Sequence, residues 1–314
     1  MKTLRILLSS FALLAPAVAA ALPNELPAGR MTDHVVIVSI DGLRPDAIEQ
    51  FGAKTLMRLM REGSYTLSAQ TILPSKTLPS HTSMLTGVDA EKHGITWNSD
   101  ETDAHGHVAV PTVFALAKAQ GYSTAAFFSK TKFHHLDVPN SLDYIRAPKG
   151  GLGGILDDKW PAKKTVGNVE KYLEGGASPN LLFVHIGEPD YAGHLFGWMG
   201  RMYASAVREA DKAVSEIIDE SNDRFGAGNY TLIVTADHGG HDKNHGSDDP
   251  RDTTIPWIAW GKGVSAGQSI SSGVRTMDTA ATALWLLAVG APPEWMGRPV
   301  ATAFADAPVF AATN

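Results

Sequence analysis

The chain has 314 residues, of which 27 are Lys or Arg, 33 are Asp or Glu, 12 are His and none is Cys. The formal net charge of -6 argues against a protein that binds nucleic-acid duplexes, because such proteins usually present a basic face. The lack of Cys excludes disulfides, thiolate metal sites and a cysteine nucleophile. Any bound metal must therefore be held by nitrogen and oxygen atoms.

The N-terminal segment has the pattern of a secretory signal peptide. Lys2 and Arg5 precede an apolar run over residues 6–14, and small residues fill positions 17–21. This run is too short to span a bilayer, and no later run reaches the roughly 18 apolar residues that a membrane span needs. We therefore expect residues 1–21 to be removed and the mature protein to be exported, either to a periplasm or into the medium.

Buried strands are predicted where apolar and β-branched residues follow one another without interruption. The strongest runs are residues 34–40, 180–186 and 230–235, and shorter ones are 123–128 and 257–260. Strands of this kind are typical of a parallel sheet that helices cover on both faces.

Helices are predicted between these strands, from apolar residues at helical spacing and from Gly or Pro at the ends of the segments. The ranges are 45–62, 111–120, 201–221 and 278–289. Alternating strands and helices favour an α/β fold, a three-layer sandwich with a mostly parallel central sheet. We expect a single catalytic domain over residues 22–314, with a loop-rich excursion over the sheet at about residues 131–161.

Acidic residues follow the three strongest strands directly. Asp41 comes after the first strand, Asp190 shortly after the second, and Asp237 after the third. One such residue is commonly a helix cap or a turn former. The carboxyl ends of parallel strands lie at one edge of a sheet, however, and ligands bind there. Three carboxylates from distant parts of the chain are therefore expected to converge.

Histidines accompany two of these carboxylates. His194 follows Asp190 by four residues, so one helical turn places both side chains on the same face. His238 follows Asp237 directly, and His245 lies in the polar, Gly-rich segment beyond it. Three Asp and three His are enough for two metal sites that suit Zn²⁺, with Mn²⁺ or Fe as alternatives. The cations would also neutralise the clustered carboxylates.

A candidate nucleophile lies at the start of a predicted helix. Pro79 suits the first turn of a helix, which places Thr77 just outside the helix N-terminus. Free backbone N–H groups there favour an anion such as a phosphoryl group. A threonine hydroxyl needs a base or a metal to become nucleophilic, and taken alone this residue would be a plain helix cap.

Taken together, these segments resemble the type I phosphodiesterase/nucleotide pyrophosphatase family of the alkaline phosphatase superfamily. The matching segments, in the order of the family, are Ile40–Asp46, Lys76–His81, His93–Asn98, Glu188–His194, Ala236–Gly239 and His245–Gly246. Each motif is weak by itself, but their common order over most of the chain makes the resemblance specific. It implies an alkaline-phosphatase-like fold and the hydrolysis of phosphoric esters.

The resemblance also implies roles for individual residues. The residues that match the ligands of one Zn²⁺ are Asp190, His194 and His245, and those that match the ligands of the other are Asp41, Asp237 and His238. Thr77 would bridge to the second ion and form a phospho-threonine intermediate. Asn98 matches an asparagine that binds a phosphoryl oxygen together with the backbone N–H of Thr77. The implied substrate is a small phosphate ester, a nucleotide being one option, and no protein partner is indicated.

The remaining histidines carry no ligand role in the family. We interpret three of them as structural and the others as residues of surface loops. The structural set is His81, His93 and His241, and the loop set is His105, His107, His134 and His135.

One segment departs from the family. Its phosphodiesterases usually have Trp-Pro-Gly after the strand that ends here at Phe128, whereas this chain has Ser129-Lys130-Thr131-Lys132. Threonine-type alkaline phosphatases have a similar Lys-x-Arg, which makes Lys130 and Lys132 candidate substrate-binding residues. A phosphomonoesterase is therefore the alternative hypothesis, because a monoester carries one more negative charge than a diester. A solvated basic loop is the competing interpretation of the two lysines.

Further alternatives are a phosphonate hydrolase and a non-catalytic metal-binding protein. Sulfatases share the fold, but their formylglycine nucleophile needs a precursor that Thr77 cannot supply. Sulfate esters are therefore the least expected substrates.

Overall fold

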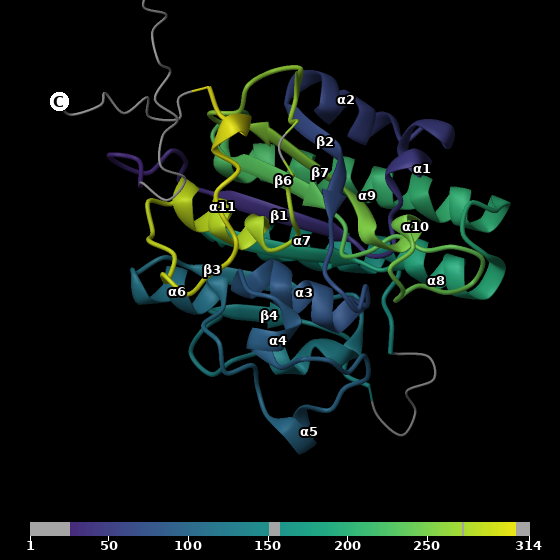
Figure 1. Cartoon of the computed structure of the whole chain (residues 1–314). Helices are drawn as coiled ribbons and strands as arrows, with labels where there is room; N and C mark the ends of the chain where they lie inside the picture. Colours follow the sequence, from purple (N-terminus) through teal and green to yellow (C-terminus); the bar gives the residue numbers. More distant parts are fainter. Residues whose placement is uncertain (1–25, 151–157, 272, 306–314) are drawn as a thin grey trace, which may run out of the picture.

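A computed structural model describes residues 26–150, 158–271 and 273–305, and the predicted signal peptide over residues 1–21 lies outside these ranges. Its strands are β1 (Val35–Ile40), β2 (Ser64–Gln70), β3 (Thr124–Phe127), β4 (Tyr144–Arg146), β5 (Leu181–Ile186), β6 (Thr231–Thr235), β7 (Thr254–Gly261) and β8 (Gln268–Ser269). They form one eight-stranded sheet in the order β4-β3-β5-β1-β6-β7-β2-β8, which lies in the middle of the molecule (Figure 1).

The central strands are parallel and fully buried. Strand β1 lies between β5 and β6, and Val36 pairs with Leu182 on one side and with Leu232 on the other. Strand β3 is parallel to β5, and β7 is antiparallel to β6. The carboxyl ends of β1, β3, β5 and β6 therefore share one edge of the sheet, as the sequence predicts.

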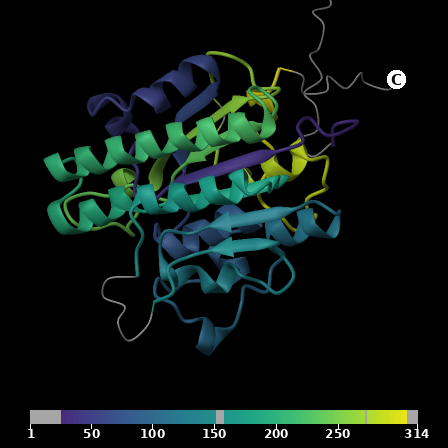
Figure 2. The same cartoon turned by 180° about the vertical axis from the view of Figure 1, so that it is seen from behind.

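Helices cover both faces of this sheet. Their bounds are α1 Pro45–Gln50, α2 Lys54–Glu62, α3 Thr77–Thr86, α4 Ala90–His93, α5 Thr102–His105, α6 Val113–Ala119, α7 Ala162–Glu174, α8 Glu188–Phe196, α9 Arg201–Phe225, α10 Pro250–Thr253 and α11 Asp278–Leu286, with short 3-10 helices at Thr131–Leu136 and Ala301–Ala303. Helices α2, α7 and α8 pack against α9 on one face, and α3, α6 and α11 pack together on the other (Figures 1 and 2). The predicted three-layer α/β sandwich is confirmed.

Two of the predicted elements differ in the structure. The helix expected over residues 45–62 is interrupted between Gln50 and Lys54, because Gly52 takes a left-handed φ of 66° that ends a helix. The range 131–161, expected to be a loop-rich excursion over the sheet, includes β4, which joins the sheet as an edge strand beside β3, and its residues 151–157 lie outside the described ranges. The prediction of a single domain over residues 22–314 stays a prediction.

Strands β2 and β8 and helix α7 are additional to the predicted elements. In β2 the exposure of the side chains varies along the strand, so no uninterrupted apolar run marks it in the sequence. Within the described ranges, no helix is both long and apolar enough to cross a membrane.

Candidate metal centre and active site

The three aspartates predicted to converge do lie together. Asp41 follows β1, Asp190 lies in the first turn of α8 after β5, and Asp237 follows β6. Because β1 is the middle strand of these three, the side chains meet at one edge of the sheet. The backbone N–H of Asp190 donates a hydrogen bond of 3.0 Å to the carbonyl of Asp41, which joins the two segments directly.

A glycine allows this close approach. Gly42 has a φ of 72°, and a Cβ at this position would lie 2.9 Å from the Cα of Asp190. Its carbonyl accepts hydrogen bonds from the hydroxyl of Tyr203 at 2.8 Å and from Nε1 of Trp198 at 3.0 Å. The turn after β1 is thus fixed in a shape that only glycine adopts without strain.

The first candidate metal-binding group joins Asp190, His194 and His245, whose ligand atoms lie within 4.8 Å of one another. Nε2 of His194 is 3.3 Å from Oδ1 of Asp190, which confirms that one turn of α8 brings the two side chains together. Nδ1 of His194 bonds the carbonyl of Lys243, and Nδ1 of His245 bonds the carbonyl of Ser75. A proton on each Nδ1 leaves the lone pairs of Nε2 for a metal.

The second candidate group consists of Asp41, Asp190 and His238, again with ligand atoms within 4.8 Å. Asp237, expected here in place of Asp190, lies beside the group, with Oδ2 3.2 Å from Nε2 of His238. The hydroxyl of Thr77 is 3.5 Å from the same Nε2. The candidate nucleophile and the carboxylates of both groups therefore lie within a few ångströms of one imidazole.

The carboxylates fit the binding of cations. Oδ1 of Asp41, Oδ1 of Asp190 and Oδ2 of Asp237 are buried and accept no hydrogen bond from the residues that the structure describes. A buried acceptor without a partner is costly, and a divalent cation would satisfy it. Burial and repulsion by His238 lower the pKa of His245 to about 4, so its imidazole is neutral at pH 7, as a metal ligand must be.

Lys130 contacts both groups. Its ammonium nitrogen lies 2.6 Å from Oδ2 of Asp41 and 2.6 Å from Oδ2 of Asp190. Burial by itself would raise the pKa of both aspartates, but the attraction of Lys130, together with contacts to neighbouring histidines, holds each pKa well below its ordinary value. The lysine predicted to bind substrate is thus an ion-pair partner of two candidate metal ligands.

Lys132 and Asn98 meet at the N-terminus of α3. Oδ1 of Asn98 accepts hydrogen bonds of 3.0 Å from the backbone N–H of Leu78 and from Nζ of Lys132. Burial, and then repulsion by Lys130, lower the pKa of Lys132 to about 8. Thr77 is the first residue of α3 and Lys76 its N-cap, so the hydroxyl lies one position further into the helix than predicted.

Two buried histidines that were not predicted as site residues complete the surroundings. Nε2 of His185 is 2.9 Å from Oδ2 of Asp41, and burial lowers the pKa of His185 to about 4. Nδ1 of His81 is 2.8 Å from the carbonyl of Thr77 and 3.3 Å from Oδ2 of Asp237. His81 fits the structural role expected of it. His185 was not predicted, because a single histidine within an apolar, buried strand gives no other indication of a functional site.

One interpretation of the remaining histidines is wrong. His135 is completely buried, and its Nε2 is 2.9 Å from the hydroxyl of Thr82, so it is not a surface loop residue. It lies in a 3-10 helix that packs against α3. His105, His107 and His134 are exposed, as expected.

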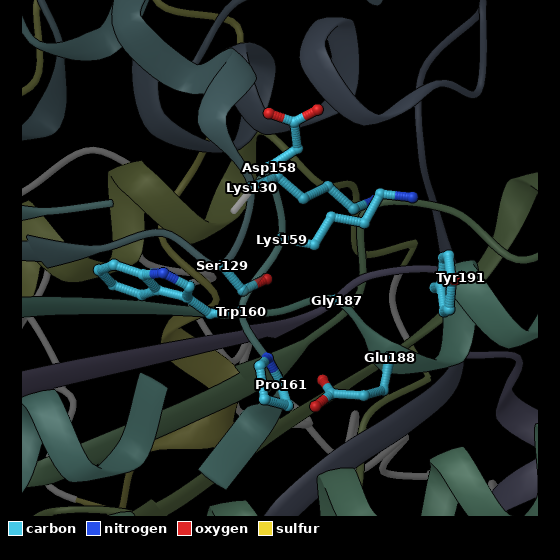
Figure 3. Close-up of a pocket in the computed structure, with 9 residues that line it drawn as sticks. All are labelled: Ser129, Lys130, Asp158, Lys159, Trp160, Pro161, Gly187, Glu188 and Tyr191. Atoms are coloured by element: carbon cyan, nitrogen blue, oxygen red, sulfur yellow. The ribbon is translucent and has the colours of Figure 1, made fainter. Parts of the chain in front are cut away.

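A pocket of about 580 Å³ adjoins Lys130, which contacts the candidate metal groups. Its lining residues are Ser129, Lys130, Asp158, Lys159, Trp160, Pro161, Gly187, Glu188 and Tyr191. Figure 3 shows Trp160 and Tyr191 at opposite sides of this group, and the ammonium of Lys159 lies 4.3 Å from the ring centre of Tyr191. Burial raises the pKa of Glu188 to about 7. The pocket thus offers aromatic and charged side chains next to Lys130, which contacts the candidate metal ligands Asp41 and Asp190.

The chain is similar to known proteins in sequence and in fold. It is 24% identical to human ectonucleotide pyrophosphatase/phosphodiesterase family member 1 over 68% of this chain and 24% of that protein. It is 25% identical to the bis(5'-adenosyl)-triphosphatase enpp4 of Xenopus laevis over 69% of this chain and 49% of that protein. The chain therefore spans less than half the length of these curated relatives.

Among solved structures, murine ectonucleotide pyrophosphatase/phosphodiesterase 5, an inactive form in complex with AMP, superposes with a TM-score of 0.70 at 16% identity. The superposition covers 83% of this chain and 96% of the murine one, and it shows that the two share a fold. The family model described as type I phosphodiesterase / nucleotide pyrophosphatase matches residues 35–255. This range contains all the candidate ligands, Thr77 and Asn98, and the chain belongs to the type I phosphodiesterase/nucleotide pyrophosphatase family.

Proposed function

We propose that this protein is an exported hydrolase of phosphoric esters that acts as a phosphodiesterase or nucleotide pyrophosphatase. The observation that carries the proposal is the meeting of Thr77 with two candidate metal-binding groups and Asp237, where three buried carboxylate oxygens lack hydrogen-bond partners among the described residues. Membership of the family supports the same class of reaction.

Two zinc ions are the proposed cofactors, with Mn²⁺ or Fe as alternatives. Asp190, His194 and His245 would hold one ion, and Asp41, Asp237 and His238 the other. Metal ions in such a site lower the pKa of the attacking hydroxyl and stabilise the charge on the leaving oxygen. The mixed carboxylate and imidazole ligands of this chain suit zinc.

Thr77 is the proposed nucleophile. Its oxygen attacks phosphorus in line while the bond from phosphorus to the leaving oxygen breaks, and the proton of the Thr77 hydroxyl is balanced by the proton that the leaving alcohol gains, so that a phospho-threonine forms. Water then attacks the phosphorus of this intermediate, which restores the Thr77 hydroxyl and releases the phosphate product. His81 holds the carbonyl of Thr77, and the N-terminus of α3 provides backbone N–H groups for the phosphoryl oxygens.

The pocket beside the site would hold the group that is esterified to the phosphate. Trp160 and Tyr191 offer aromatic faces, and the pocket begins at Lys130, next to the candidate metal ligands. The AMP bound to the murine relative supports a nucleotide as the substrate class.

Phosphomonoester hydrolysis is the second candidate activity. Lys132 lies against Asn98, where an additional cation would stabilise the extra negative charge of a monoester. Lys130 is committed to two carboxylates, so Lys132 is the better candidate for this role.

The mature protein should be assayed on bis-p-nitrophenyl phosphate and on p-nitrophenyl phosphate, with a chelator and after zinc is restored. We expect faster diester turnover, which the chelator abolishes, and a loss of roughly 1,000-fold in Thr77→Ala, with partial activity in Thr77→Ser. Turnover that survives chelation or the alanine variant would contradict the proposal. A Lys132→Met variant that loses monoester turnover alone would favour the second candidate.

Export is tested separately. The full chain, expressed in a bacterial host, should appear outside the cytoplasm, with an N-terminus close to residue 22 by mass spectrometry. Retention of the intact chain in the cytoplasm would contradict this part of the proposal.

A further inference from the structure

Lys130 joins two carboxylates of the candidate metal groups, Asp41 of the second group and Asp190 of both. It follows β3, whereas Asp41 follows β1 and Asp190 lies in α8, so three separate elements meet at its ammonium. The two distances, each 2.6 Å, are those of short charge-assisted hydrogen bonds. The side chain of Lys130 is buried, so solvent screens these contacts little.

In each aspartate one oxygen contacts the ammonium and the other faces a histidine of the candidate metal groups; Oδ2 of Asp41 is also 2.9 Å from Nε2 of His185. Oδ2 of Asp41 and Oδ2 of Asp190 contact Lys130, whereas Oδ1 of Asp41 is 3.4 Å from Nε2 of His238 and Oδ1 of Asp190 is 3.3 Å from Nε2 of His194. The oxygens that face the histidines are also among those without a hydrogen-bond partner in the described residues. Lys130 therefore leaves unpaired the two buried oxygens that face His238 and His194.

Lys130 also offsets the negative charges of Asp41 and Asp190. Among the described residues, it is the only Lys or Arg that forms an ion pair with Asp41 or Asp190, and their other ion-pair partners are histidines. Two buried carboxylates repel each other, and this repulsion must be offset while no metal ion is bound. Metal ions neutralise the same carboxylates much more strongly once they arrive, and they repel the ammonium.

We propose that Lys130 is a built-in counter-cation that holds Asp41 and Asp190 in place before metal ions bind. This inference rests on the proposed metal sites but not on the proposed reaction. It makes Lys130 a positioning residue of the metal-free protein, which folds with its ligand set already assembled. Loss of the ammonium is therefore more costly without metal than with it.

The test compares thermal unfolding of wild type, Lys130→Met, Lys130→Arg and Lys132→Met, each with a chelator and with saturating zinc. In chelator, Lys130→Met should lower Tm by roughly 10 °C, because removing one partner of a buried ion pair leaves uncompensated buried charge. In zinc the loss should be less than half as large, so that zinc raises the Tm of this variant more than that of wild type. Lys130→Arg, which keeps the charge, should stay close to wild type.

Lys132→Met is the matched control, because it removes a largely buried cation of the same segment that contacts Asn98 instead of the carboxylates. It should lower Tm equally in chelator and in zinc. An equal loss for Lys130→Met in both conditions would reduce Lys130 to an ordinary packing residue and overturn the proposal. A smaller zinc effect in Lys130→Met than in wild type would also overturn it.

If Lys130→Met fails to fold without zinc, the double variant with Asp190→Asn decides the question in chelator. Removing the negative charge should restore folding that the single variant loses, whereas continued failure would overturn the proposal. No ester is used in these measurements. If the Tm values are as expected but the protein hydrolyses no ester, only the proposed reaction is contradicted. If the Tm of wild type does not respond to zinc, the proposed metal sites are contradicted.

Discussion

The imidazoles of His238 and His245 stack face to face, with ring centroids 3.7 Å apart and planes inclined by 10°. The two histidines belong to different candidate metal groups, and the segment after β6 supplies both of them. The two candidate metal groups therefore lie side by side, in contact through the stacked rings, and Asp190 belongs to both. Replacing a histidine that belongs to only one group should therefore distinguish the two candidate sites.

Replacement of His245 should remove one metal ion and leave the other. His245→Ala deletes a ligand of the first group but none of the second, so elemental analysis should show a decrease from two metal ions per chain to one. The affinity of the lost site should fall by more than about 100-fold, because even outer partners of metal ligands contribute 10- to 100-fold. His241→Ala, at a residue that bonds Asp252 instead, should keep both ions. Retention of both ions by His245→Ala would refute its assignment as a ligand.

Gly42→Ala should disturb the site far more than Gly52→Ala. Both glycines have a left-handed φ, 72° and 66°, but a Cβ at Gly42 would lie 2.9 Å from Asp190, whereas nothing lies within 4 Å of one at Gly52. Gly52→Ala should therefore cost only about 1 kcal/mol of unfolding free energy, the price of the backbone conformation. Gly42→Ala should decrease the free energy of unfolding several-fold more than Gly52→Ala does, and it should also lower kcat. Denaturant unfolding and steady-state kinetics measure both, and equal losses in the two variants would show that the close approach is unimportant.

The buried His135 should make the protein less stable in mild acid. Burial lowers its pKa from the ordinary 6.5 to about 3, so between these values the unfolded chain binds a proton that the folded protein does not. Stability is therefore fully present above about pH 6.5 and is lost as the pH falls towards 3. In chelator, the free energy of unfolding should decrease less between pH 7.5 and pH 5 for His135→Gln than for wild type. Parallel pH profiles would contradict the predicted shift.

Tyr191 should contribute to the binding of an ester with an aromatic group. Tyr191→Ala removes an exposed ring at the pocket and should raise KM for a nucleotide ester by up to about tenfold, with kcat nearly unchanged, since an aromatic contact contributes about 1 kcal/mol. Leu195→Ala, at an exposed residue of the same helix that does not line the pocket, is the matched control and should leave KM unchanged. An unchanged KM in Tyr191→Ala would place the esterified group elsewhere.

The sequence by itself determined the central part of the fold and the composition of the candidate site. Strands β1, β5 and β6 are uninterrupted apolar runs, so their burial and parallel arrangement follow from local composition. Asp41, Asp190 and Asp237 come at or shortly after the ends of these strands, and ligand-binding residues of parallel sheets gather at that edge. The pairing of Asp190 with His194 needs only the period of one helix.

Only the tertiary structure decided which side chains surround these residues. His185 reaches Asp41 because β1 and β5 pair with Ser39 opposite His185, a register that neither strand specifies alone. Lys130 reaches two carboxylates because β3 lies next to β5 in the sheet, although 60 residues separate it from Asp190. Periodicity in a sequence reports which face a residue occupies. The partner it meets across that face depends on strand order and register, which the packing of the whole chain sets.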